Sequence, residues 1–112
     1  MVKFVNYIAI LLFVVFSFSF AQQNSKRIAD IKSSVVCEMC KERIEKQLKK
    51  VKGILNVDVI LDTKTIKVEF DTTKVSLADI KLTISKIGYD ADEVKKDPKA
   101  YKKLPKCCRI DG

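Results

Sequence analysis

The stretch VVCEMCKERIEKQL, residues 35–48, contains the change from a strand pattern to a helix pattern that decides the fold. The residues up to its first cysteine, RIADIKSSVV, fit the alternation of a β-strand with one buried face. After the second cysteine, apolar residues recur at helical spacing and predict a helix from about residue 38 to residue 51. Its apolar face consists of Cys40, Ile44, Leu48 and Val51. The chain therefore places a Cys-x-x-Cys pair, Cys37 and Cys40, where a helix begins.

The rest of the pattern contains further strands and a second helix. Residues 54–61, ILNVDVIL, and residues 64–70, KTIKVEF, alternate as two strands joined by a short turn. Ser76 and Asp79 form a capping-box-like pair at the start of a helix. We expect YDADEV, residues 89–94, to form the last strand. The predicted buried residues of these strands and of the helix are Leu55, Val57, Val59, Leu61, Ile66, Val68 and Phe70, then Leu77, Ile80, Ile84 and Ile87.

The β-α-β-β-α-β order over residues 27–94 is that of a ferredoxin-like fold. We therefore expect an α+β sandwich, in which a four-stranded antiparallel sheet carries both helices on one face. The last residues contain both prolines and no periodicity, and predict a tail that bears Cys107 and Cys108. The expected organisation is a signal peptide at residues 1–21, a domain at residues 22–96 and the tail at residues 97–112.

The N-terminal segment has the composition of a signal peptide. Lys3 precedes an apolar core, and the segment ends in Ser19-Phe20-Ala21, a small-x-small pattern that suits signal peptidase. An uncleaved membrane anchor is the alternative, because the apolar run is close to the minimum length of a membrane span. In both cases we expect the rest of the chain to lie outside the cytoplasm, in the periplasm or secreted.

The composition argues against several classes of protein. The 22 basic and 14 acidic residues give a formal net charge of +8 at pH 7. No basic platform interleaved with aromatic residues accompanies this charge, so we interpret the lysines as a solvated surface and expect no nucleic-acid partner. The chain has no histidine, which removes the usual general base, Cys–His catalysis and imidazole metal ligation. We expect a monomer that is not an enzyme.

The cysteine pair fits a soft metal ion. A helix N-terminus lowers the pKa of a thiol through its dipole and its free backbone donors. Two thiolates at this spacing suit the low coordination number of Cu(I), whereas structural zinc requires four ligands. Thiol–disulfide exchange and a purely structural Cys37–Cys40 bridge are the alternatives. The chain argues against a thioredoxin-like enzyme, because it has no tryptophan and both prolines, Pro98 and Pro105, fall in the predicted tail.

The chain resembles heavy-metal-associated domains, the small modules of copper chaperones, copper-ATPase amino termini and the periplasmic mercury-binding protein. The resemblance covers residues 27–94 and rests on the Cys-x-x-Cys pair, on KGILNVDV after the first helix and on KIGYDA after the second. It implies that Cys37 and Cys40 bind the metal, and that Tyr89 lies beside the metal without being a ligand. The family commonly has Gly-Met-Thr before its first cysteine, where this chain has Ser-Val-Val and places Val35 at the methionine position.

The expected function is that of an exported carrier, which binds Cu(I) and passes it by thiolate exchange to a thiol-bearing acceptor such as a metal-transporting membrane protein. Mercury(II) or another soft metal is the alternative cargo, and a thiol–disulfide redox protein is the alternative function. Cys107 and Cys108 have three open roles: extra metal thiolates, a second donor site, or a disulfide with Cys37, Cys40 or another chain. An extended segment after residue 94 would span roughly 40 Å by Cys107, enough to return to the first loop.

Overall fold

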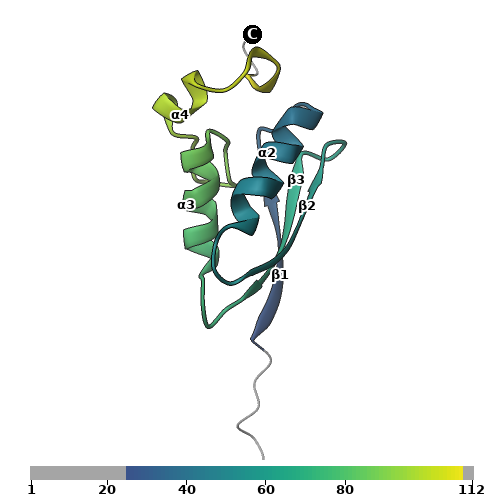
Figure 1. The fold of residues 1–112 in the computed structure, drawn as a ribbon, viewed down its shortest axis with the longest axis vertical. Coiled ribbons are helices and arrows are strands. Elements are labelled where there is room, and N and C mark those ends of the chain that lie inside the picture. The colour runs from purple at the N-terminus through teal and green to yellow at the C-terminus, as the bar shows by residue number, and fades with distance from the viewer. Residues whose placement is uncertain (1–24, 110–112) are drawn as a thin grey trace, which may run out of the picture.

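The computed structural model describes residues 25–109 and has helices packed on one sheet (Figure 1). Its elements are β1 (Lys26–Lys32), α2 (Glu38–Lys49), β2 (Ile54–Ile60), β3 (Thr65–Asp71), α3 (Leu77–Ile87), α4 (Pro98–Lys102) and the 3-10 turn η2 (Lys106–Cys108). The predicted signal peptide, residues 1–21, lies outside the described residues. Within residues 25–109, no helix has the length and apolar character needed to cross a membrane.

The strands form an antiparallel sheet in the order β1-β3-β2. The residues that alternate onto its buried face include Ile31, Val57, Val59, Ile66, Val68 and Phe70. The prediction that Leu55 is buried is wrong, because this residue is 49% exposed. The pairing of β2 with β3 shifts register between Ile54 and Asn56, and such a shift changes the face on which a residue lies. Ile54 packs partly buried against the core instead.

The two long helices bury the faces that the periodicity predicted. Cys40, Ile44 and Leu48 of α2 are fully buried, as are Ile80 and Ile84 of α3. These side chains share one core with the inner face of the sheet, and Figure 1 shows α2 and α3 side by side against it. Most of the hydrophobic free energy of a small domain comes from such a shared core.

Caps fix both ends of α3, and the predicted start at Ser76 is confirmed. The hydroxyl of Ser76 accepts a hydrogen bond from the backbone N–H of Asp79 at 3.1 Å. Gly88 follows the helix at φ 117°, in the left-handed region that a glycine adopts without steric cost. This residue turns the chain directly into Tyr89, so the end of α3 positions the segment that reaches the cysteines.

The fourth strand expected at residues 89–94 does not form. Ala91 and Val94 exchange two backbone hydrogen bonds of 2.9 Å across a tight turn, and Asp92 inside it has φ 52°. A left-handed residue cannot continue an extended strand. The Asp92 carboxylate also accepts a hydrogen bond from the backbone N–H of Lys32, and the backbone N–H of Asp92 donates to the carbonyl of Lys32, at 2.8 Å each. A turn therefore pairs with the free edge of β1, and the described residues contain a three-stranded sheet.

Regular structure continues into the predicted tail. The side chain of Asp97 caps α4 by accepting from the backbone N–H of Lys99 at 3.1 Å, and the N–H of Asp97 donates to the carbonyl of Ser85 at 3.0 Å. Leu104 and Cys108 belong to the buried core. Periodicity did not predict these short elements, because contacts with distant residues hold them. In Figure 1 they lie at the end of the molecule where α2 begins. The domain boundary at residue 96 stays a prediction.

Candidate metal centre

The Cys-x-x-Cys loop sets its two thiols in different surroundings. Cys37 is the N-cap of α2, and its carbonyl accepts from the backbone N–H groups of Cys40 and Lys41 at 3.0 and 3.2 Å. Its thiol makes no capping hydrogen bond and is partly exposed. Cys40 is fully buried, because it begins the apolar face of the helix. The Sγ atoms of Cys37 and Cys40 are 3.3 Å apart.

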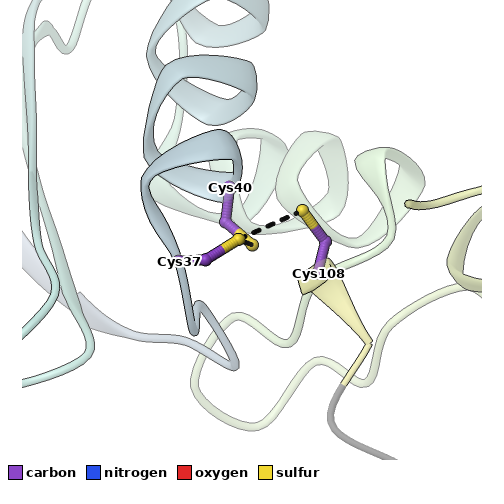
Figure 2. Close-up of side chains that lie close together, drawn as sticks. All are labelled: Cys37, Cys40 and Cys108. Atoms are coloured by element: carbon purple, nitrogen blue, oxygen red, sulfur yellow. Dashed lines mark hydrogen bonds between the residues drawn. The ribbon is translucent and has the colours of Figure 1, made fainter. Parts of the chain in front are cut away.

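The C-terminal cysteine pair lies against the same loop. The Sγ atom of Cys37 is 3.3 Å from that of Cys107 and 3.6 Å from that of Cys108. Figure 2 shows Cys37, Cys40 and Cys108 pointing toward one another from two separate segments, and their Sγ atoms all lie within 4.8 Å of one another. All four cysteines are free thiols. The structure therefore brings every cysteine of the chain together, whereas the sequence assigned Cys37 and Cys40 to the site and left the roles of Cys107 and Cys108 open.

A fifth sulfur atom lies at the outer side of this cluster. The Sγ atom of Cys107 is 3.5 Å from the Sδ atom of Met39, and both side chains are exposed. Nothing in the residue pattern around Met39 indicated a contact with the C-terminal pair. Only the return of the C-terminal segment makes this contact. A cysteine pair with enough intervening chain to reach the first loop was the one available signal for it.

Tyr89 lies beside the buried thiols. It is fully buried, and its hydroxyl has no hydrogen-bond partner within standard geometry among the described residues. Burial raises the pKa of Tyr89 well above its ordinary value, and the nearby thiols of Cys40 and Cys108 raise it further. The phenol is therefore a neutral donor. A buried donor without a partner is uncommon, and here it stands next to sulfur atoms that accept hydrogen bonds once they ionise.

Two contacts hold Tyr89 in this position. Its backbone N–H donates to the carbonyl of Ile84 at 3.3 Å, at the end of α3. The next residue, Asp90, donates its backbone N–H to the hydroxyl of Ser34 at 3.0 Å. Ser34 is buried just before the Cys-x-x-Cys loop, and Val35 after it is fully buried. The loop after α3 is thus tied directly to the loop that carries the cysteines.

The thiols of the cluster differ in acidity. Burial opposes ionisation of Cys37, but the backbone N–H of Cys40 and hydrogen bonds with the other three thiols outweigh it and lower the pKa of Cys37 to about 7. The hydrogen bond with Cys37 raises the pKa of Cys107. Burial, and next the hydrogen bond with Cys40, raise the pKa of Cys108. Near neutral pH, Cys37 is therefore the thiol of these three that ionises first.

The fold and these thiols define a class of protein: a small α+β domain with a Cys-x-x-Cys pair in its first strand-to-helix loop. A family model described as "Heavy-metal-associated domain" matches residues 31–90, more than half of the chain. The chain therefore belongs to the heavy-metal-associated domain family. The match contains Cys37, Cys40 and Tyr89 and ends before Cys107 and Cys108.

Curated relatives include a large copper-exporting ATPase and small copper chaperones. The chain is similar to a copper-exporting P-type ATPase of Bacillus subtilis, with 36% identity over 55 residues, which are 49% of this chain and 7% of the ATPase. It is also similar to the copper chaperone CopZ of Staphylococcus epidermidis, with 35% identity over 54 residues, 48% of this chain and 79% of that protein. The chain thus spans a small fraction of the ATPase and most of the chaperone.

Solved structures repeat this similarity. A CopZ metallochaperone aligns with a TM-score of 0.56 and 27% identity over 58% of this chain and 98% of its own. A second structure is the N-terminal domain of a potential copper-translocating P-type ATPase from Bacillus subtilis, in the Cu(I)-loaded state. It aligns with a TM-score of 0.57 and 31% identity, over 60% of this chain and 85% of that domain. Oxidized MerP from Ralstonia metallidurans CH34 aligns with a TM-score of 0.57 and 25% identity, over 60% of this chain and 94% of MerP.

Proposed function

We propose that this protein binds Cu(I) through the thiolates of Cys37 and Cys40 and passes the ion on by thiolate exchange. The observation that carries the proposal is the pair of Sγ atoms 3.3 Å apart at the N-terminus of α2, within a heavy-metal-associated domain. Thiolates are soft ligands that select Cu(I). The copper chaperones and the Cu(I)-loaded ATPase domain among the similar proteins support copper as the cargo.

The different exposure of Cys37 and Cys40 supports transfer of the ion by thiolate exchange. Cys37 is partly exposed, and its pKa of about 7 supplies a thiolate near neutral pH. Cys40 is buried and held by the helix. An incoming thiolate can therefore approach the ion from the side of Cys37 and bind before Cys37 leaves, while Cys40 keeps the ion in place. The free backbone donors at the start of α2 stabilise the negative charge of the dithiolate.

The proposal includes export and an acceptor. We place the protein in the periplasm or outside the cell, on the signal-peptide pattern of residues 1–21. The acceptor would be a thiol-bearing protein such as a metal-transporting membrane protein, and the similarity to a copper-exporting ATPase supports that class. The carrier needs no catalytic turnover, and it acts as a monomer.

Mercury(II) is the second candidate cargo. Two thiolates suit this soft ion as well as they suit Cu(I), and oxidized MerP is among the similar structures. A competition experiment with a small thiol distinguishes the two cargoes, because a protein adapted to mercury keeps Hg(II) against the thiol and yields Cu(I) to it.

The experiment begins with the intact mass of the purified, reduced protein, which reports whether residues 1–21 have been removed. Native mass spectrometry follows after one equivalent of Cu(I). We expect one copper per chain in the wild type and its loss in the double variant Cys37→Ser, Cys40→Ser. Copper retained equally by that variant would contradict the assignment. Absence of copper from every sample, with disulfide exchange toward a model substrate, would support the redox alternative instead.

A further inference from the structure

We propose that Cys108 is a third metal ligand, so that Cys37, Cys40 and Cys108 form a three-thiolate site that holds a soft ion in trigonal geometry. This inference rests on the proposed function and concerns the same centre. It uses a segment beyond residues 31–90, which are the residues matched by the family. The Cys-x-x-Cys pair of the domain would then be completed from within the same chain.

The fold holds Cys108 in place before any metal binds. The N–H of Cys108 donates to the carbonyl of Pro105 at 2.9 Å, which forms the turn η2. Leu104, just before this turn, is buried in the core at 5% exposure and packs close to Gly88 at the end of α3. Cys108 itself is 1% exposed. A ligand already fixed at the site loses little conformational entropy when the metal binds.

The sulfur separations fit three ligands better than two. A metal–thiolate bond of about 2.3 Å puts two sulfurs about 4.6 Å apart in a linear site and about 4.0 Å apart in a planar three-sulfur site. The Sγ atoms of Cys37 and Cys40 are 3.3 Å apart, and those of Cys37 and Cys108 are 3.6 Å apart. All three atoms lie within 4.8 Å of one another. A small expansion of this cluster accommodates a trigonal ion, whereas a linear site must move Cys37 and Cys40 apart by more than 1 Å.

The surroundings of Cys108 distinguish it from Cys107. Cys108 is buried beside Cys40 and Tyr89, whereas Cys107 is exposed and contacts Met39. Water is excluded from the side of the cluster where Cys40, Cys108 and Tyr89 meet. The hydroxyl of Tyr89 has no partner there and can donate to a metal-bound thiolate, which compensates part of the charge buried with three thiolates. Cys107 is therefore the matched control: an adjacent cysteine at the rim of the same cluster.

X-ray absorption at the copper edge tests the proposal on the purified protein loaded with one equivalent of Cu(I). We expect about three sulfur neighbours of copper in the wild type and in Cys107→Ala, and two in Cys108→Ala. In competition with a Cu(I) chelator, Cys108→Ala should release copper at least tenfold more readily, and Cys107→Ala should stay within threefold of the wild type. Cys108→Ser repeats the test with a near-isosteric residue. Circular dichroism of the metal-free variants establishes that each one is folded.

Two sulfur neighbours in the wild type, or an unchanged number in both Cys108 variants, would overturn the proposal and leave the proposed function standing. Loss of the third sulfur neighbour in Cys107→Ala, and not in Cys108→Ala, would identify Cys107 as the third ligand and would also overturn the proposal. Native mass spectrometry of the same samples must find one chain per copper, because a third sulfur supplied by a second chain would appear as a dimer. A wild type that retains no copper would overturn the proposed function itself.

Discussion

At the scale of single residues, the four cysteines have identical side chains but different surroundings. Cys37 is partly exposed and has a lowered pKa, whereas Cys107 is exposed and has a raised pKa. Cys40 and Cys108 are buried. A thiolate, rather than a thiol, attacks electrophiles and binds metals. Reactivity should therefore concentrate at Cys37, although Cys107 is the more exposed of the two.

Alkylation of the reduced, metal-free protein tests this difference. With a pKa of about 7, the thiolate fraction of Cys37 rises about tenfold between pH 6 and pH 8, an interval that lies entirely below the ordinary thiol pKa of about 8.5. We expect iodoacetamide to label Cys37 first at pH 7, as read by peptide mass mapping. Cys107 is the internal control. Faster labelling of Cys107 at pH 7 would contradict the assigned order of acidity.

Tyr89 has a hydroxyl that the metal-free core does not use. We expect Tyr89→Phe to leave the metal-free protein folded, and equally stable or more stable by up to about 1–2 kcal/mol, because a buried polar group without a partner is removed. We expect its Cu(I) retention against a chelator to fall, by up to about tenfold, because a donor to the thiolates is lost. Urea unfolding and chelator competition measure the two effects. An unfolded variant would rule out a role for this residue beside the metal.

At the scale of elements, the junction between α3 and α4 connects the core to the cluster. Gly88 ends α3 at φ 117°, and a Cβ atom there would lie 3.1 Å from Leu104 Cδ1 and 3.2 Å from the backbone of Ala100. The same turn leads into Tyr89. One glycine thus sets both the close approach of the C-terminal segment and the position of the tyrosine.

We expect Gly88→Ala to lower the free energy of unfolding by more than about 1 kcal/mol, because it forces a side chain into the left-handed region and against a backbone neighbour. Urea unfolding measures the change. Lys86→Ala, an exposed substitution in the last turn of the same helix, should stay within about 0.5 kcal/mol of the wild type. Equal effects of the two substitutions would argue against close packing of this junction.

At the scale of the whole molecule, the C-terminal segment is part of the hydrophobic core. Leu104 and Cys108 are buried with residues of α2, α3 and the sheet. Contacts between residues far apart in the sequence cost loop-closure entropy, which apolar burial must offset. The segment therefore belongs to the cooperative unit that unfolds, and its attachment supports the position of Cys108.

Substitution of Leu104 tests this attachment. We expect Leu104→Ala to lower the free energy of unfolding by about 2–5 kcal/mol, the usual cost of truncating a buried leucine. Leu82→Ala is the matched control, because Leu82 is 50% exposed on α3, and it should cost less than about 1 kcal/mol. Urea unfolding of the metal-free variants measures both. A change at Leu104 no larger than that at Leu82 would indicate a detachable tail.

Local patterns predicted the three strands and two long helices well, because each of them has a period of its own. The helix faces at Ile44 and Ile84 and the cap at Ser76 follow directly from spacing and residue type. The exposure of Leu55 could not be predicted, since a register shift depends on the partner strand. The turn at Asp92 was also missed, because its backbone geometry is held by bonds to Lys32 on another strand.

The sequence by itself determined the α+β class, the Cys-x-x-Cys pair at a helix start, and the family features that place Tyr89 near it. These properties depend on residues close together in the chain. Only the tertiary structure decided that Cys107 and Cys108 return to Cys37, and that Cys108 is buried beside Cys40. Their position results from the packing of Leu104 and the short helix before it. Long-range packing of this kind leaves no periodic trace in the sequence.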